Sequence, residues 1–439
     1  MMLKAYIKSF FSSCFLLSII NSLFGFIYTF CLIRLCSQSL TLSESASFLV
    51  LFTSLGLVKN SDLCKLDYFF SNLIQSCSID VKNIISLGFR EQLYTINSIA
   101  AKAVRYSYSR LYTYLLTSSI SLISIISVFF LLSRSENILF ALSSTIFIIL
   151  YHLTDSLVRP FVLAFEFVLK LRYALAIQII VKFILLSILV VGIILDQYLF
   201  FTLLSSVFLL FIVFIVLVFL FSSLVLAIQF NVPRILKISP IFLNRSHFQL
   251  YLPILLGFVN AQCDAPLALA LLDPQSANNL FFAYTISKTI SVPSRSLIMP
   301  LRANFSHLLH GPDTISAFRF LQKNMLLSFV LSSLLFALIS SLFFLSPMTH
   351  FLSPPPFLLT FIIALSELIA GIFYPAIDCL IFSGSYNLSR FLLLAPVINI
   401  ILSVFFASFL GANGIAIATL LSVCIVTIPT YRMGLTTLS

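Results

Sequence analysis

The chain has 439 residues, of which 60% are hydrophobic and 9% charged, and its formal net charge is +11. A mean hydropathy of +1.13, with several charge-free runs longer than about 20 residues, excludes a soluble globular domain and predicts a polytopic membrane protein. The cations are scattered at the ends of the apolar runs, without a basic stripe interleaved with aromatic residues. The charge therefore does not predict nucleic-acid binding.

Charges and helix breakers divide the chain into about twelve candidate transmembrane helices, an all-α class. Their limits are residues 9–33, 44–66, 110–132, 137–158, 176–195, 198–226, 246–270, 275–300, 324–346, 356–379, 387–409 and 412–430. The first run is too long for the apolar core of a cleavable signal peptide, so we expect it to stay as a membrane span.

Positive charge alternates between the loops of this pattern. Nearly all Lys and Arg fall on one set of loops, whereas the alternate loops hold only Arg34 and Arg134. Because cytoplasmic loops carry the excess of Lys and Arg, we expect both termini to be cytoplasmic.

The loops give little room for enzyme chemistry. Those expected outside, such as residues 133–136 and 273–274, are too short to hold a catalytic site for long sugars. The longest cytoplasmic loop, residues 72–109, lacks the GxxxxGK[ST] motif that cradles ATP phosphates, and no Ser/His/Asp constellation stands out elsewhere. The eight Cys form no CxxC or Cys/His cluster, so we expect a non-enzyme without a metal or other cofactor.

The two halves of the chain resemble each other in three places that keep the same order. Residues 45–49 (SASFL) match 276–280 (SANNL), residues 182–186 (KFILL) match 390–394 (RFLLL), and residues 202–205 (TLLS) match 419–422 (TLLS). The matching spans run in the same direction, which predicts a parallel repeat about an axis along the membrane normal, as in many secondary transporters. Chance likeness between Leu-rich helices is the alternative.

Four short stretches are similar to the multidrug/oligosaccharidyl-lipid/polysaccharide exporter superfamily, and specifically to Wzx-type flippases of O-antigen and capsule units. They are Arg34-Leu35 followed by the acid Glu44, the mid-span Gly56-Leu57, the Pro293 to Pro300 end of the eighth span, and the Gly-x-x-Gly-x-x-x-Ala opening at Gly411, Gly414 and Ala418. The loop at residues 36–43 departs from the family in lacking the usual Gly.

The resemblance implies an N-terminal lobe (1–230), a cytoplasmic linker (231–245) and a C-terminal lobe (246–439), with about six helices in each lobe around a central cavity. It implies alternating access in the bacterial inner membrane, moving undecaprenyl-diphosphate-linked O-antigen or capsule repeat units from the cytoplasmic to the periplasmic leaflet, a step of lipopolysaccharide or capsule biosynthesis. The implied partners are this lipid-linked substrate and membrane lipids, together with a polysaccharide polymerase and a chain-length regulator.

Three cations are candidate substrate ligands. Lys288 lies roughly 20 Å into the eighth span by helical rise, and Lys59 lies at a similar depth in the second span, its counterpart in the repeat. Charges at such depth are costly and usually face a cavity or an anionic ligand, here a diphosphate. Arg295 could receive phosphate nearer the cytoplasm. The alternative for Lys59 and Arg295 is anchoring at the lipid headgroups.

Acidic residues are candidates for ion coupling, because a carboxyl in an apolar site can exchange protons near neutral pH. Glu367 lies near the middle of the tenth span, and Asp264 lies in the seventh, where Gln262 and Pro266 predict a broken helix. A structural pair with Lys or Arg is the alternative for each. Arg34 and Glu44, at the outer ends of the first two spans, form a candidate gate.

Three other functions are alternatives to the flippase. A multidrug exporter of the same superfamily would favour an acidic cavity for cationic drugs, whereas here the cations near the membrane centre at least match the acids. A membrane polysaccharide polymerase would need a long outer loop. A non-transporting scaffold would not need buried charges.

Overall fold

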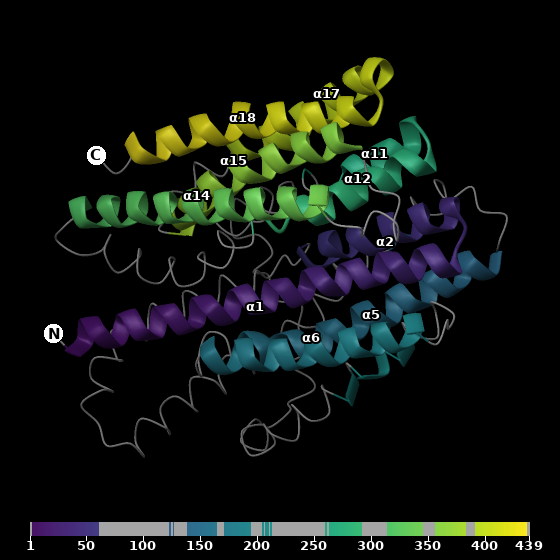
Figure 1. Ribbon diagram of the computed structural model, residues 1–439, viewed down its shortest axis with the longest axis horizontal. Coiled ribbons are helices and arrows are strands. Elements are labelled where there is room, and N and C mark those ends of the chain that lie inside the picture. The colour runs from purple at the N-terminus through teal and green to yellow at the C-terminus, as the bar shows by residue number, and fades with distance from the viewer. Residues whose placement is uncertain are drawn as a thin grey trace, which may run out of the picture. The chain divides into compact units, whose positions relative to one another are not determined.

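The computed structural model describes residues 2–60, 138–164, 171–194, 263–291, 314–345, 356–382 and 391–436, with isolated positions between 123 and 260. Throughout these residues the regular secondary structure is helical. The helices are α1 (Met2–Ser39), α2 (Leu42–Asn60), α5 (Ile138–Ala164), α6 (Leu171–Ile194), α11 (Asp264–Leu271), α12 (Pro274–Ser287), α14 (Thr314–Leu345), α15 (Phe357–Phe382), α17 (Leu394–Leu410) and α18 (Ala412–Thr436) (Figure 1).

Four of the described helices contain a stretch long and apolar enough to cross a membrane. These stretches are Leu16–Cys36, Arg319–Leu338, Phe357–Tyr374 and Ala412–Gly434. The first, ninth, tenth and twelfth predicted spans coincide with them. The predicted spans at 110–132 and 198–226 lie almost entirely outside the described residues.

Local capping interactions fix the starts of two helices. At the start of α2, Thr41 and Glu44 form a capping box: the Thr41 amide donates to Glu44 Oε2 at 3.1 Å, and the Glu44 amide donates to Thr41 Oγ1 at 3.3 Å. Asp273 is the N-cap of α12, where its Oδ1 accepts the Ser276 amide at 2.8 Å, and Pro274 follows at the first helical position. Both turns are therefore encoded in a few consecutive residues.

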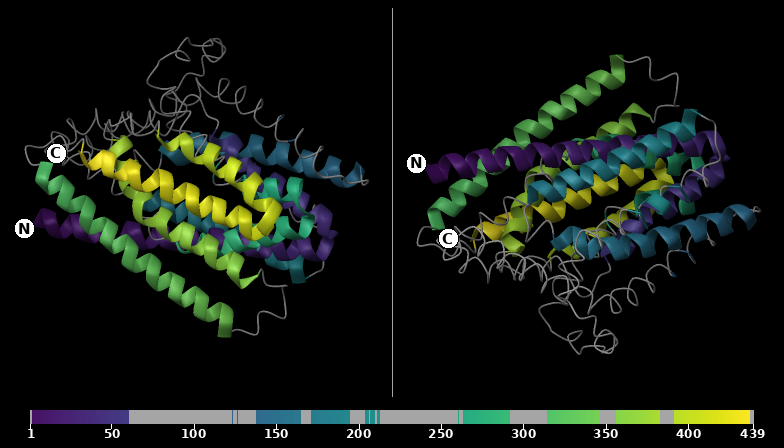
Figure 2. Two further views of the ribbon diagram at one scale, coloured as in Figure 1. Left: turned by 90° about the horizontal axis from the view of Figure 1, so that it is seen from above. Right: turned by 90° about the horizontal axis from the view of Figure 1, so that it is seen from below.

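The hairpin of α17 and α18 explains the Gly-x-x-Gly opening. Gly411 has a φ of +59°, a conformation that L side chains rarely adopt, and it turns the chain between the two helices. A Cβ on Gly414 would lie 2.3 Å from the Phe406 carbonyl oxygen, so the second glycine lets α18 approach α17 closely. Figures 1 and 2 show α15 lying alongside α18, which completes this group.

Helix α17 has its polar face inside and its apolar face outside. The buried side chains recur every four residues, at Asn399, Ser403 and Ala407. The opposite face exposes large apolar side chains: Val397, Ile401, Val404, Phe405 and Phe409. This arrangement suits a helix whose outer face meets lipid and not water.

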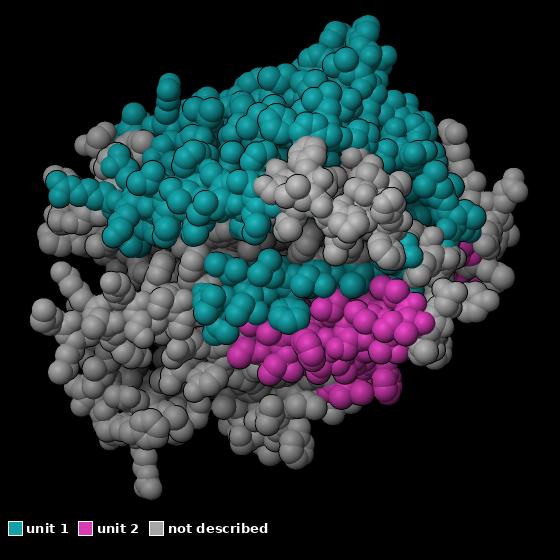
Figure 3. All heavy atoms as spheres, in the orientation of Figure 1, with its two compact units in different colours: residues 1–57, 128–136, 252–439 teal, residues 58–127, 137–251 magenta. Residues whose placement is uncertain are grey.

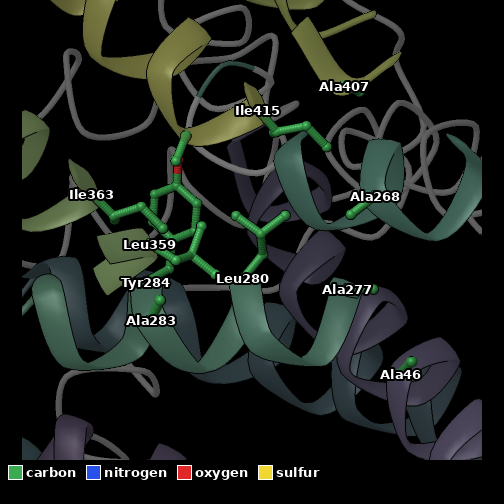
Figure 4. Packing of buried hydrophobic residues seen from close by; sticks show 11 residues of the cluster. Ala46, Ala268, Ala277, Leu280, Ala283, Tyr284, Leu359, Ile363, Ala407 and Ile415 are labelled. Carbon is green, nitrogen blue, oxygen red and sulfur yellow. The ribbon is translucent and has the colours of Figure 1, made fainter. Parts of the chain in front are cut away.

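Small residues dominate the core where the C-terminal helices meet. The main buried cluster has eleven residues, drawn from α2, α11, α12, α15, α17 and α18. Its members include Ala268, Ala277, Ala283, Tyr284 and Leu359 (Figure 4). Alanine side chains let helices approach closely, which is how membrane helices gain packing energy without a hydrophobic driving force between them.

By internal contacts the chain forms two compact units (Figure 3). One contains residues 1–57, 128–136 and 252–439, and the other contains residues 58–127 and 137–251. The first helices therefore group with the C-terminal ones. The predicted lobes divided at 231–245 stay a prediction, and that linker lies outside the described residues.

Within the first unit, α2 contacts α12 near the N-termini of both helices, which Thr41 and Asp273 cap. Asn278 Nδ2 donates to the Leu42 carbonyl oxygen at 3.3 Å. Ala46 and Ala277, which the sequence repeat places at equivalent positions, lie in the same buried cluster. Two segments that the predicted repeat matches thus pack together.

Candidate functional site

A buried polar cluster in the first unit centres on Asp264, whose side chain is 2% exposed. Asp264 is the first residue of α11, and a bend at Cys263 precedes it. The helix therefore begins at the residue that bears the carboxyl, and Pro266 lies in the first turn, where a proline is tolerated. Because residues 261–262 lie outside the described residues, the predicted break in this span stays a prediction.

Four side chains from α12, α17, α18 and the bend donate hydrogen bonds to the Asp264 carboxyl. The Tyr284 hydroxyl and the Thr419 hydroxyl donate to Oδ2. Asn399 Nδ2 donates to Oδ1 at 3.0 Å, and the Cys263 thiol donates to the same oxygen at 3.4 Å. A buried carboxylate is tolerable only with such donors, because each one replaces part of its lost hydration.

The outer members of the cluster allow the hydrogen bonds to rearrange. Thr419 has one hydroxyl proton, and besides Asp264 it lies 3.2 Å from both Asn399 Oδ1 and the Ile415 carbonyl oxygen. When Asp264 is protonated it becomes a donor, and the Thr419 proton can turn to either of these acceptors. Ser403 donates to Asn399 Oδ1 at 3.3 Å and supports the amide orientation. The cluster can therefore accommodate both protonation states of Asp264.

Lys288 lies one turn beyond Tyr284, at the end of α12. Its Nζ is 5.8 Å from the centroid of the Tyr284 ring, within the range of a cation–π interaction. Lys288 is partly exposed, although Ile286, Ser287, Thr289 and Ile290 around it are buried.

The backbone changes at Lys288 from α-helical bonding to tighter turns. The Lys288 amide still bonds to the Tyr284 carbonyl oxygen four residues back, at 2.8 Å. The next amides, those of Thr289, Ile290 and Ser291, bond three residues back. Three-residue turns of this kind are common where an α-helix ends. The helix of the predicted span 275–300 therefore starts one residue earlier than expected, and its backbone hydrogen bonding changes at Lys288, the candidate substrate ligand.

The remaining predicted site residues are placed only in part. Glu367 is partly exposed on α15, and Arg34 is partly exposed near the end of α1. Glu44 belongs to the capping box of α2. Lys59 is in the last turn of α2, but its side chain lies outside the described residues, as does the whole of Arg295. The proposed Lys59–Lys288 pairing thus stays a prediction.

The structure brings Asp264 and Lys288 together through Tyr284, a residue that the sequence reasoning missed. It also missed Asn399 and Thr419, which complete the cluster. A signal existed for two of these residues. Tyr284 precedes Lys288 by four residues, so both lie on one helix face. Asn399 is an isolated amide in an otherwise apolar span.

The sequence matches no protein-family model and no curated protein. Solved structures do match. The eukaryotic MATE transporter AtDTX14 has a TM-score of 0.65 at 12% identity, covering 99% of both chains. An outward-facing multidrug resistance MATE transporter of the MOP superfamily has a TM-score of 0.65 at 12% identity, covering 98% of this chain and 96% of the other. A MOP superfamily transporter from Pyrococcus furiosus, described as having a binding pocket of reversed polarity, has a TM-score of 0.64 at 11% identity, with coverages of 98% and 96%.

These matches show the fold alone, which is the helical fold of the matched MATE transporters. The predicted fold class is confirmed, and the chain is a multi-pass membrane protein. At 11–13% identity the likeness is to the superfamily's transporter fold and does not single out the Wzx-type flippases. The matched structures include one of a multidrug resistance transporter.

Proposed function

We propose that this chain is a secondary transporter of an anionic, lipid-linked substrate. The substrate class is an undecaprenyl-diphosphate-linked oligosaccharide, carried by alternating access from the cytoplasmic to the periplasmic leaflet of a bacterial inner membrane. Asp264 is the proposed site of proton coupling. The transporter fold supports the first part of this proposal, and the charges of the site support the choice of substrate.

The observation that carries the proposal is Lys288. It is a cation in the C-terminal helical bundle, partly exposed at a change of helix geometry, while the nearby carboxyl of Asp264 is enclosed by donors. The charged residue that is partly exposed is thus positive, and the acidic group is enclosed by donors. A diphosphate suits this arrangement, since lysine attracts compact anions without demanding bidentate geometry.

Export of cationic drugs is the second candidate, because matched structures of the same fold belong to multidrug transporters. The Pyrococcus furiosus transporter, with its reversed pocket polarity, supports the idea that the fold serves substrates of different charge. The two candidates differ in their need for Lys288. Transport of an anionic substrate requires Lys288, whereas removing this positive charge should leave the rate of cationic drug transport unchanged or raise that rate.

The test compares Lys288→Ala with Lys323→Ala, which removes an exposed lysine on α14. Proteoliposomes are loaded with undecaprenyl-diphosphate-linked oligosaccharide, and movement between leaflets is followed by access of an external lectin. We expect at least a tenfold slower rate for Lys288→Ala, given the loss of a charge-assisted contact, and an unchanged rate for Lys323→Ala. Equal rates in all three proteins, or ethidium transport without oligosaccharide movement, would contradict the proposal.

A further inference from the structure

Tyr284 touches both functional groups of the site. Its hydroxyl donates to Asp264 Oδ2, and its ring lies under the Lys288 ammonium at 5.8 Å from the centroid. In Figure 4 the Tyr284 side chain extends away from α12 within the buried cluster. One rigid side chain, with only two rotatable angles, therefore spans the distance from the carboxyl to the cation.

The hydroxyl end of Tyr284 responds to the charge of Asp264. A hydrogen bond to an ionised carboxylate is roughly twice as strong as one between neutral groups. Once Asp264 is protonated, its own proton competes for the same partners, and the Thr419 hydroxyl can turn to Asn399 or Ile415. Protonation thus loosens the attachment that fixes the Tyr284 ring.

The ring end of Tyr284 sets the place of Lys288. A cation is attracted to the face of the ring, so a fixed ring favours one position of the ammonium. Lys288 also lies where the backbone passes into three-residue turns, whose bonding is weaker than that of an α-helix. A small movement of the ring can therefore shift the lysine.

We propose that Tyr284 is a positioning residue that makes anion binding at Lys288 depend on the protonation of Asp264. With Asp264 ionised, Tyr284 holds Lys288 ready for the anion; with Asp264 protonated, this order is lost and the anion is released. The inference rests on the proposed function and names the link between its two sites. It yields exchange of a proton for an anion, as an exporter driven by an inward proton gradient requires.

A direct charge effect would have the opposite sign. Neutralising a nearby carboxylate should strengthen anion binding at Lys288, because it removes a repulsion. Lys288 is partly exposed, so water screens this long-range effect. The fixing of the ring is a contact effect that water does not screen. The sign of the pH dependence thus separates the two mechanisms.

Other titratable groups close to the site are few among the described side chains. Cys263 contacts Asp264 directly. Helix α17 carries no titratable residue, and α18 contributes the uncharged Thr419 to the cluster. On α15, Glu367 lies one turn beyond Ile363, a residue of the same buried cluster as Tyr284. On α1, which also touches α12, Arg34 is the charged residue among the described side chains.

The experiment measures binding of inorganic pyrophosphate to the purified full-length protein between about pH 8 and about pH 5, a range that lies above the ordinary pKa of aspartate. We expect roughly tenfold weaker binding at the acid end in the wild type, a typical coupling between two sites. Tyr284→Phe keeps the ring and removes the hydroxyl, and it should bind with one affinity at all pH values apart from the titration of pyrophosphate itself. Asp264→Asn should show the weak affinity throughout. Repeating the series with Glu367→Gln assigns the remaining pH dependence to Asp264.

The outcomes separate this inference from the proposed function. Binding that strengthens with acid, or a pH dependence that survives Tyr284→Phe in a protein whose thermal unfolding is unchanged, would overturn the role of Tyr284 and leave the flippase proposal standing. If Tyr284→Phe does not fold, Asp264→Asn decides, because strong binding by that variant would also overturn the inference. A wild type that does not bind pyrophosphate would overturn both.

Discussion

At the scale of single residues, the C-terminal bundle depends on two glycines with different tasks. Gly411 supplies a backbone conformation and has open space around its Cα. Gly414 has ordinary backbone angles but no room for a side chain against Phe406. The same sequence motif thus combines a conformational requirement with a packing requirement.

Replacing Gly414 with Ala should destabilise the protein. The added Cβ would meet a backbone carbonyl, which cannot rotate away, so α17 and α18 must separate. Overpacking of this kind typically costs about 1–3 kcal/mol. The midpoint of thermal unfolding in detergent should fall for Gly414→Ala and stay unchanged for Ser408→Ala, an exposed position on the neighbouring helix. Equal midpoints for all three proteins would show that the helices can yield at this contact.

At the scale of helices, the N-cap of α12 carries a dependence on pH. Asp273 lies in the short turn before the helix, outside the predicted membrane span. The Ser276 amide that donates to its carboxylate lowers the pKa of Asp273 below its ordinary value, and the Ser276 hydroxyl adds a second bond at 2.8 Å. Since the folded pKa is the lower one, this cap stabilises the protein above the ordinary pKa and loses its effect as the pH falls through the lowered value.

Asp273→Ala should therefore destabilise the protein by about 1 kcal/mol at neutral pH, the usual cost of losing an N-cap. The difference from wild type should shrink below about pH 4, where aspartate begins to be protonated. Asp273→Asn is the matched control, because it can still accept the Ser276 amide but does not titrate. Unfolding midpoints of the three proteins between neutral and acid pH measure the effect, and a constant gap would contradict it.

At the scale of the whole molecule, the alternation of loop charge predicts the orientation. Alkaline phosphatase fused after Ser439 should be inactive, because this reporter folds only outside the cytoplasm, whereas a fusion after Arg134 should be active. A fluorescent protein at the same two positions should give the reverse pattern. An active phosphatase after Ser439 would place the C-terminus outside and contradict the cytoplasmic assignment of the termini.

Much of the fold could be predicted from the sequence because lipid imposes a simple rule on every span. The predicted spans 356–379 and 412–430 start within one residue of the starts of α15 and α18, and both end before these helices end. Asp264 could be selected because charges are rare in such spans. The cluster around it could not, since Tyr284, Asn399 and Thr419 are ordinary residues until α12, α17 and α18 bring them to one carboxyl. These contacts depend on how the helices pack, which the spacing along the chain does not specify.

The inverted polarity of α17 has a consequence for how such a protein changes over evolutionary time. Its outward face needs only to be apolar, so Val, Ile, Leu and Phe can replace one another there at little cost. Selection acts mainly on the few inward positions that keep neighbouring helices together. Over long divergence most of the sequence can drift while the arrangement of helices persists. A likeness of fold with few shared residues is what this freedom allows, and the TM-score of 0.65 to AtDTX14 at 12% identity is such a case.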